Sequence, residues 1–215
     1  MRGGLLPLLP RHLARFERSR VALGLARPES DLATLLGAPA GTLDAVRRVE
    51  VAGGRASCTE SAFTPPPPPA VVTVGVPHEP YVHKTTARTC FDAALREAAG
   101  AGAADALLLT AEGLVAEGTV WNLFWWEGGR LLTPGLGLGV LAGVARARVL
   151  ELAGDAVEGS FPRAALDGRS LFLTNAIRGV QPIGSLDGKR VPEDPRTAAL
   201  AERFWPGDDD AATAR

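Results

Sequence analysis

Five consecutive prolines at residues 65–69 impose the strongest single constraint on how this chain can fold. Proline has no backbone N–H and a fixed φ, so the run cannot lie inside a helix or pair in the middle of a sheet. It favours polyproline II and predicts a stiff connector. A second break follows at residues 77–80, Pro-His-Glu-Pro. We place the domain boundary there, between a small domain of residues 1–76 and a larger domain of residues 77–215.

The small domain is predicted to contain both helices and strands. Apolar residues at near-helical spacing predict a helix over residues 10–26, and a short helix is expected over residues 29–36. Two strands over residues 42–51 and 56–63 flank a glycine-containing turn, which predicts a hairpin. The apolar residues 70–76 form one more short strand.

The larger domain is predicted to begin with a helix over residues 85–99, which ends at Gly100. Two further helices are expected over residues 142–153 and 196–204. The strands are expected over residues 105–110, 114–115, 119–126, 131–133, 170–173 and 179–183, with a hairpin turn at Asp187-Gly188. Helices and strands are mixed without strict β-α-β alternation, so the predicted fold class is α+β.

Charge and composition argue against several classes of partner. The net charge of -1 favours neither nucleic acid nor an anionic membrane, and no apolar run reaches the roughly 18 residues that span a bilayer. Two cysteines, Cys58 and Cys90, make neither a disulfide framework nor a zinc site. Pro7 and Pro10 interrupt the start of the chain, which argues against a signal peptide. These features predict a cytoplasmic protein that acts on a small molecule.

Lysine is rare in this chain, because only Lys84 and Lys189 occur among 23 lysine and arginine residues. Lys84 follows an extended segment and precedes a predicted helix, so its side chain can point from a strand end into a cleft. Lys189 follows the predicted hairpin turn, which keeps it in water. An enzyme that needs a lysine nucleophile would therefore use Lys84. The local sequence alone favours the simpler interpretation, a solvated lysine at a helix start.

Glu117 is a lone carboxylate set between the apolar residues of the strands predicted over residues 114–115 and 119–126. Burying such a group is costly unless a partner pairs with it. A pyridine nitrogen is one such partner, and a carboxylate that keeps this nitrogen protonated makes the ring a better electron sink. The alternative is a turn glutamate beside the Gly118-Thr119 bend.

Two further segments could bind a phosphate. The glycine-rich residues 135–143 lead into a predicted helix, whose free N–H groups and dipole favour an anion. Their spacing matches neither the Walker A motif nor the dinucleotide motif. Thr174, Asn175 and Ala176 follow an apolar strand and could also donate to a phosphate. A flexible loop and an ordinary turn are the alternatives.

Taken in order, these segments resemble the class IV aminotransferases, which are fold-type IV pyridoxal-phosphate enzymes. The match extends over nearly the whole chain, and its specificity lies in order and spacing. The resemblance is carried by His12-Leu13-Ala14-Arg15-Phe16, His83-Lys84-Thr85-Thr86, Glu117-Gly118-Thr119, Asn122-Leu123-Phe124, Thr133-Pro134, Gly143-Val144-Ala145-Arg146 and Thr174-Asn175-Ala176.

The resemblance implies a cofactor, pyridoxal 5'-phosphate, and a role for each matching residue. The lysine that matches Lys84 forms a Schiff base with the cofactor, and the glutamate that matches Glu117 binds the pyridine nitrogen. The phosphate is bound by residues that match Arg15, Val144, Ala145, Thr174, Asn175 and Ala176. The resemblance also implies a small α+β domain, a larger pseudo-barrel domain, an active site between them, and a homodimer.

An aromatic cluster gives an independent reason to expect a homodimer. Trp121, Phe124, Trp125 and Trp126 offer more apolar surface than one alternating strand face can bury.

Within the family, the His83–Thr86 and Thr174–Ala176 strings resemble the 4-amino-4-deoxychorismate lyase branch. This implies release of pyruvate and 4-aminobenzoate, a step of folate biosynthesis. Candidates for the substrate side of the site are Tyr81, His83 and Arg88. The alternatives are a class IV aminotransferase acting on branched-chain or D-amino acids, and a shortened, non-catalytic relative.

The chain departs from the family pattern in two places. Ala145 stands where relatives usually have a threonine, so one hydroxyl that could bind phosphate is missing. Relatives also carry a strand before the segment that matches Met1. In this chain, Met1 itself is expected to lie inside that strand. The absence of the strand would leave an unpaired sheet edge and remove part of the substrate wall.

Overall fold

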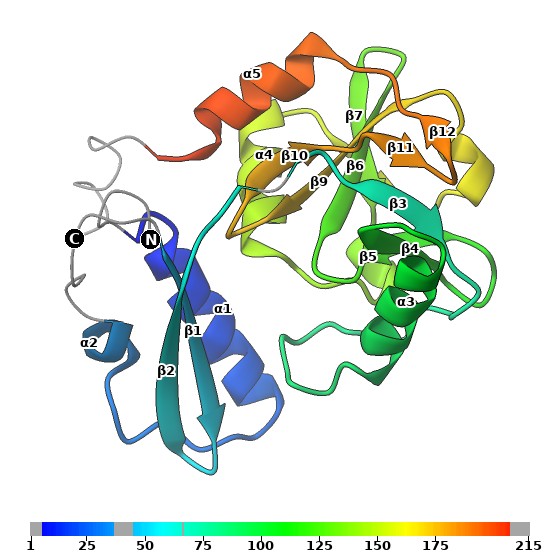
Figure 1. Ribbon diagram of the computed structural model, residues 1–215. Helices are drawn as coiled ribbons and strands as arrows, with labels where there is room; N and C mark the ends of the chain where they lie inside the picture. The colour runs from blue at the N-terminus through cyan, green and yellow to red at the C-terminus, as the bar shows by residue number, and fades with distance from the viewer. Residues whose placement is uncertain (1–5, 37–44, 66, 207–215) are drawn as a thin grey trace. The chain divides into compact units, whose positions relative to one another are not determined.

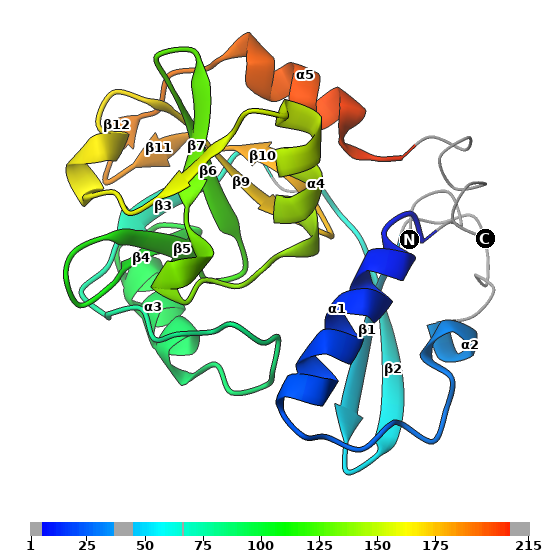
Figure 2. The same cartoon turned by 180° about the vertical axis from the view of Figure 1, so that it is seen from behind.

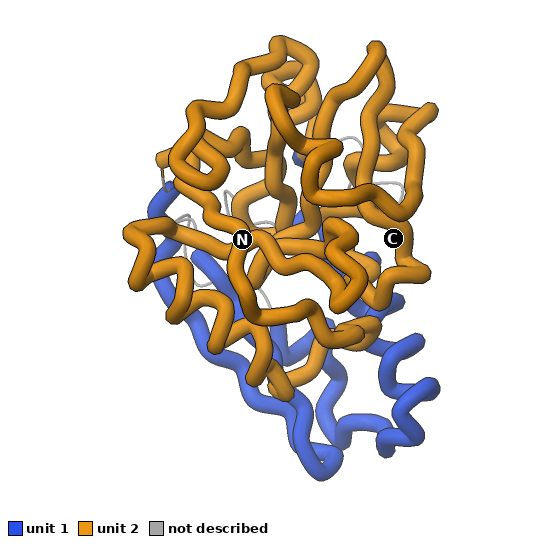
Figure 3. Tube along the Cα trace, turned by 90° about the vertical axis from the view of Figure 1, so that its right-hand side faces the viewer, with its two compact units in different colours: residues 1–65, 205–215 blue, residues 66–204 orange. Residues whose placement is uncertain are grey.

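The structure is a computed structural model that describes residues 6–36, 45–65 and 67–206. It divides into two compact units, Met1–Pro65 with Trp205–Arg215, and Pro66–Phe204 (Figure 3). The division falls in the proline run, earlier than the boundary that we placed after residue 76. The reason is strand β3 (Ala70–Thr73), which pairs in parallel with β4 (Asp105–Leu109) and so belongs to the second unit.

The described residues of the first unit form two helices and one hairpin. Helix α1 (Leu9–Ala22) and helix α2 (Leu32–Leu36) precede β1 (Ala45–Ala52) and β2 (Arg55–Ala62). The two strands pair antiparallel, and Ala52 and Arg55 are the last pair before the turn. Gly53 and Gly54 form this turn with φ angles of 55° and 80°, which glycine adopts without strain. The predicted helix–helix–hairpin order is confirmed. The prediction for Met1 lies outside the described residues.

Two five-stranded sheets form the second unit (Figures 1 and 2). One sheet has the strand order β12-β11-β3-β4-β5 and the other has the order β10-β9-β6-β7-β8. The strands not yet located are β5 (Val115–Gly118), β6 (Asn122–Glu127), β7 (Arg130–Pro134), β8 (Val157–Gly159), β9 (Ser170–Asn175), β10 (Gly179–Pro182), β11 (Ser185–Leu186) and β12 (Lys189–Arg190). The chain passes from the first sheet to the second in the short β5–β6 connection and returns to the first between β10 and β11.

The apolar faces of both sheets share one core. Val71 and Leu107 from the first sheet meet Leu123, Trp125 and Leu171 from the second, and all five are buried. Burial of this kind is the main favourable term in folding.

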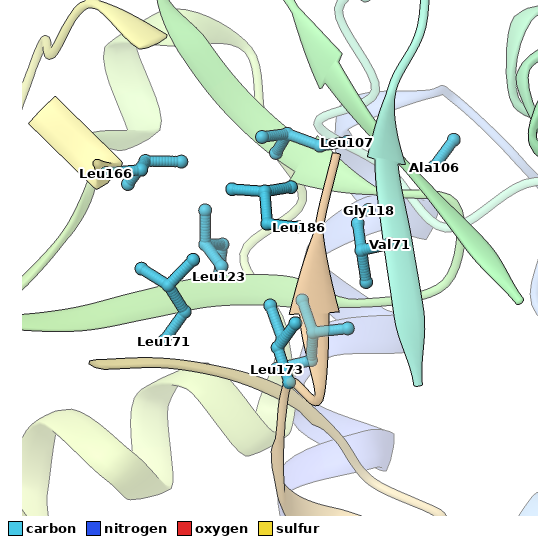
Figure 4. Close-up of a pocket in the computed structure, with 10 residues that line it drawn as sticks. Val71, Ala106, Leu107, Gly118, Leu123, Leu166, Leu171, Leu173 and Leu186 are labelled. Carbon is cyan, nitrogen blue, oxygen red and sulfur yellow. The ribbon is translucent and has the colours of Figure 1, made fainter. Parts of the chain in front are cut away.

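A small cavity of about 10 Å³ remains in this core, among leucine side chains from both sheets (Figure 4). An apolar cavity of that size holds one water at most, so this cavity has no room for a substrate or cofactor.

Helices cover the outer faces. Helix α3 (Thr89–Gly100) buries Phe91, Ala94 and Ala98 against Ala106 and Leu108 of β4. Helices α4 (Val144–Ala153) and α5 (Pro195–Phe204) lie by β9 and β10 (Figure 1). Mixed helices and strands in this order confirm the α+β class. No helix in the described parts of the chain is long and apolar enough to cross a membrane.

The aromatic cluster is buried inside the second unit, which removes the surface argument for a homodimer. Phe124 and Trp125 are 0% exposed and Trp121 is 5% exposed. Phe124 stacks on Phe172 with ring centroids 5.2 Å apart. Trp126 is half-buried, and its indole N–H donates to Thr197 Oγ1 at 3.0 Å. The expectation that these side chains leave apolar surface uncovered is therefore wrong, because Trp121 and Trp125 lie in the core between the two sheets, Phe124 stacks on Phe172 of β9, and Trp126 contacts α5.

Candidate active site

Glu117 lies on β5 and is almost fully buried, with 3% of its surface exposed. His78 Nε2 lies 3.1 Å from Oε1, and the Asn122 side-chain amide donates to Oε2 at 3.2 Å. The backbone N–H of Leu141 donates to both oxygens, at 3.1 and 3.3 Å. Side chains and backbone from three separate segments therefore fix the position of this carboxylate.

Burial raises the pKa of Glu117, although the hydrogen bond with His78 and the positive charge of Lys84 both lower it. The net direction is upward, so the neighbours do not fully compensate the loss of water around the charged carboxylate. A cation placed against Glu117 would provide that compensation. The carboxylate is thus suited to bind a protonated ring nitrogen rather than to remain a solvated turn residue.

Lys84 lies in the loop before α3, and its charge is one of those that act on Glu117. The residue is exposed, which allows its amine to reach a ligand. Lys189 lies on β12 beside the Asp187-Gly188 turn and is also exposed, and it is not among the groups that shift the pKa of Glu117. Of the two lysines, Lys84 is therefore the one whose charge affects the pKa of the buried carboxylate.

The loop that carries Lys84 is held at both ends. The Tyr81 backbone N–H donates to Gly139 O at 2.7 Å, and the Tyr81 hydroxyl accepts from the Thr85 N–H at 2.9 Å and donates to the Thr85 carbonyl. The Arg88 guanidinium donates to Thr119 O at 2.6 Å. Tyr81 and Arg88 thus hold this loop against its neighbours, and their contact with a substrate stays a prediction, as does that of His83.

The predicted helix at residues 85–99 begins later than expected, at Thr89. Its predicted first turn is instead the loop just described, because the Tyr81 hydroxyl occupies the N–H and carbonyl of Thr85. This hydrogen bonding keeps Lys84 on an irregular segment and away from a helix surface.

The glycine-rich segment ends at the first turn of α4. Gly143 is the N-cap residue, with no side-chain cap, and Val144 and Ala145 follow in the buried first turn. Asn122 connects this turn to the carboxylate, because its amide donates both to Glu117 and, at 2.9 Å, to Leu141 O. Uncapped N–H groups at a helix start are suited to an anion such as phosphate.

Thr174, Asn175 and Ala176 lie at the end of β9, where Thr174 pairs with Asn122 across the sheet. The Thr174 hydroxyl donates to Gly179 O at 2.9 Å, and the Asn175 Oδ1 atom accepts from the N–H groups of Ile177 and Arg178 at 3.0 and 2.8 Å. The predicted strand end is confirmed. Both side chains already stabilise the turn, so contact with a phosphate by these three residues stays a prediction.

The buried Glu117, the exposed Lys84 and the uncapped start of α4 at Gly143 thus belong to segments that contact one another. Such an arrangement suits a ligand that has a basic aromatic nitrogen, a group that reacts with an amine, and a phosphate.

Comparison with known proteins agrees with this geometry. The model of the family described as amino-transferase class IV matches residues 1–186. The chain belongs to the class IV aminotransferase family.

Curated relatives of this family member divide between two activities. A probable branched-chain-amino-acid aminotransferase of Thermotoga maritima is 34% identical over 110 residues, which cover 47% of this chain and 40% of that protein. An aminodeoxychorismate lyase of Vibrio harveyi is 34% identical over 108 residues, which cover 47% and 39%. The matched segments thus span about two fifths of these relatives.

Solved structures in the family share the fold. The branched-chain aminotransferase of Thermoproteus uzoniensis with norvaline superposes with a TM-score of 0.81 and 26% identity, over 90% of this chain and 76% of that chain. The enzyme of Thermobaculum terrenum in its PLP form gives a TM-score of 0.60 and 26% identity, over 64% and 50%. The predicted fold-type IV architecture is confirmed.

One residue of the site was missed by sequence reasoning. His78 is 6% exposed and contacts Glu117 through Nε2, while its Nδ1 atom is buried and has no hydrogen-bond partner among the residues that the structure describes. The sequence shows a histidine between Pro77 and Pro80, which we interpreted only as a break. A histidine next to a strand end, in a chain with three histidines, was the available clue.

Arg15 lies on α1 of the first unit, and the structure does not test its predicted role at the phosphate. Ala145 lies in the first turn of α4 as predicted, so the missing hydroxyl leaves backbone N–H groups as the donors there.

Gly143 gives a first prediction about stability. A Cβ atom built on Gly143 would lie 2.1 Å from Asn122 Oδ1, while the φ of -65° at Gly143 is one that alanine adopts freely. We expect Gly143→Ala to lower the free energy of unfolding by about 1–3 kcal/mol, as overpacking does. The loss would come from displacement of Asn122 by the new methyl group. Urea denaturation measures the free energy of unfolding.

Gly137→Ala is the matched control, because nothing lies within 4 Å of a Cβ atom at Gly137. Equal urea midpoints for the two variants would contradict the contact between Gly143 and Asn122.

Proposed function

We propose that the protein binds pyridoxal 5'-phosphate through Lys84 and Glu117 and acts as a 4-amino-4-deoxychorismate lyase. The observation that carries the proposal is the buried Glu117 carboxylate, which His78, Asn122 and Leu141 hold in place. Burial raises its pKa, and the charge of the exposed Lys84 is among the influences that lower it. The bound cofactor would supply an electron sink for a carbanion at the substrate carbon. A structural relative solved in its PLP form supports this choice of cofactor.

The residues of this chain fit that cofactor. The buried Glu117 carboxylate suits the pyridine nitrogen, and the start of α4 at Gly143, Val144 and Ala145 suits the phosphate. Thr174, Asn175 and Ala176 are proposed as further phosphate contacts, with Arg15 from the first unit. Lys84 is proposed both to hold the cofactor and, once released, to move the proton at the carbon that bears the substrate nitrogen.

Lyase activity is supported by the His83–Thr86 and Thr174–Ala176 strings and by the curated lyase relatives. An aminotransferase acting on branched-chain or D-amino acids is the second candidate. The match to branched-chain aminotransferases in sequence and in structure favours it. The cofactor-binding residues would serve both reactions. A homodimer remains part of the proposal, on the family resemblance.

Product analysis decides between the two reactions. Supplied with 4-amino-4-deoxychorismate, the protein loaded with pyridoxal phosphate should release pyruvate and 4-aminobenzoate in equal amounts. Supplied with L-leucine or a D-amino acid and 2-oxoglutarate, it should form little glutamate. 4-Aminobenzoate and glutamate can both be quantified by liquid chromatography of these reactions.

The Lys84→Ala variant is the blank for both assays, because either reaction needs the lysine amine. Glutamate formation without any 4-aminobenzoate would reject the lyase and support the aminotransferase.

A further inference from the structure

Arg178 occupies the turn between β9 and β10, directly after the proposed phosphate contacts. The Asn175 side chain accepts a hydrogen bond from its backbone N–H at 2.8 Å, which fixes the turn. Its guanidinium carbon lies 5.2 Å from the centroid of the Trp121 ring. Trp121 is itself fixed, because its indole N–H donates to the buried Asp105 at 2.9 Å. A cation on a rigid aromatic face is held ready for a ligand.

Arg178 lacks a carboxylate partner within the described residues. Its Nε atom is buried and makes no hydrogen bond there, although an unpaired buried donor is costly. Arg196 shows the usual arrangement, because it lies 4.2 Å from the Trp126 ring centroid and also donates to both oxygens of Asp194, at 2.9 and 2.6 Å. Arg178 thus packs on an aromatic ring as Arg196 does, but within the described residues it has no carboxylate partner that corresponds to Asp194.

The turn of Arg178 is joined to the candidate active site. Asn175, three residues before it, donates to Val120 O at 3.4 Å, and Thr174 pairs with Asn122, which donates to Glu117. Trp121, on which the Arg178 guanidinium packs, lies in the β5–β6 connection between Val120 and Asn122.

We propose that Arg178, held against Trp121, binds a carboxylate of the substrate. The planar guanidinium fork matches a carboxylate in a bidentate fashion, whereas the start of α4 already offers donors to a phosphate. This inference rests on the proposed function and extends it to the substrate, because both candidate reactions use substrates that carry carboxylates. Arg178 would fix the substrate's orientation relative to Lys84.

Isothermal titration of the protein loaded with pyridoxal phosphate tests the site. The probes are 4-aminobenzoate, its uncharged analogue 4-aminobenzamide, and 2-oxoglutarate. In Arg178→Gln we expect at least one of the two carboxylates to bind roughly tenfold or more weakly, as loss of charged hydrogen bonds predicts. The affinities for 4-aminobenzamide and for pyridoxal phosphate should be unchanged. Arg178→Lys keeps the charge but loses the fork, so it should be several-fold weaker, and it decides the question if Arg178→Gln does not fold.

Arg196→Gln is the matched control and should bind every probe as the wild type does. The inference is overturned if neither carboxylate loses affinity, if the amide loses as much as the acid, or if affinity for the cofactor falls. Its failure differs from failure of the lyase proposal. An Arg178-dependent affinity for a carboxylate in a protein that forms no 4-aminobenzoate would keep the carboxylate site and reject the lyase.

Discussion

Replacing Lys84 with alanine is expected to abolish the near-visible absorbance of protein mixed with pyridoxal phosphate, and to reduce turnover by several orders of magnitude. The amine is the group that would bond covalently to the cofactor and then move the substrate proton, so its loss removes both functions. The hydrogen bonds between Tyr81 and Thr85 that fix this loop are kept in the variant. The variant should therefore fold normally.

Lys189→Ala is the natural control, because it removes the other lysine of the chain from an exposed position on β12. We expect it to keep the absorbance and the activity of the wild type. If Lys189→Ala abolished the absorbance while Lys84→Ala kept it, the assignment of the nucleophile would be wrong.

Replacing Glu117 with glutamine is expected to leave cofactor attachment intact and to lower turnover on the order of 100-fold, the loss typical of removing one preorganised charged group. A neutral amide cannot hold a proton on the ring nitrogen, so the ring withdraws electrons less strongly. Steady-state kinetics measure the loss. Unchanged turnover would favour the alternative interpretation of Glu117 as a structural residue.

The same substitution has a signature in stability that does not depend on turnover. Burial raises the pKa of Glu117 above its ordinary value of 4.5, so the folded cofactor-free protein binds more protons than the unfolded chain above pH 4.5. Its free energy of unfolding should consequently fall, relative to that of Glu117→Gln, as the pH rises from 4.5 through the raised pKa. Urea denaturation at several pH values measures the difference, and a constant difference would argue against a buried, uncompensated carboxylate.

Asp105→Asn controls for the loss of any buried carboxylate. Burial also raises the pKa of Asp105, whose oxygens accept from the backbone of Ala106 and Thr119 and from Trp121. This variant should be less stable, yet it should keep the kcat that depends on the ring nitrogen; a weaker hold on Trp121, and so on Arg178, would raise the KM for the substrate.

Features that depend on local sequence were predictable from the chain alone. Apolar periodicity located α1, and the helices predicted over residues 142–153 and 196–204 match α4 and α5. The Asp187-Gly188 pair located the β11–β12 hairpin, where Asp187 and Gly188 have φ angles of 50° and 74°. The order of motifs located Lys84 and Glu117 as the candidate pair; the structure buries Glu117 and exposes Lys84, and their roles at a cofactor stay a prediction.

Features that depend on contacts between distant segments were not predictable. The late start of α3 comes from the Tyr81 hydroxyl, and the division between units comes from the pairing of β3 with β4. His78 became a candidate only when folding brought it to Glu117, 39 residues away in sequence. The short strand β8 was missed as well, because three residues carry too little periodicity to be recognised.

The central claim, that Lys84 is the residue that binds pyridoxal phosphate, has one direct test. Protein mixed with the cofactor is reduced with borohydride, which makes the lysine–cofactor bond permanent, and the modified peptide is identified by mass spectrometry. Since the chain contains two lysines, the result can be read unambiguously. The account predicts a phosphopyridoxyl group on Lys84 with Lys189 unmodified. Modification of Lys189 alone, or of neither lysine, would contradict it.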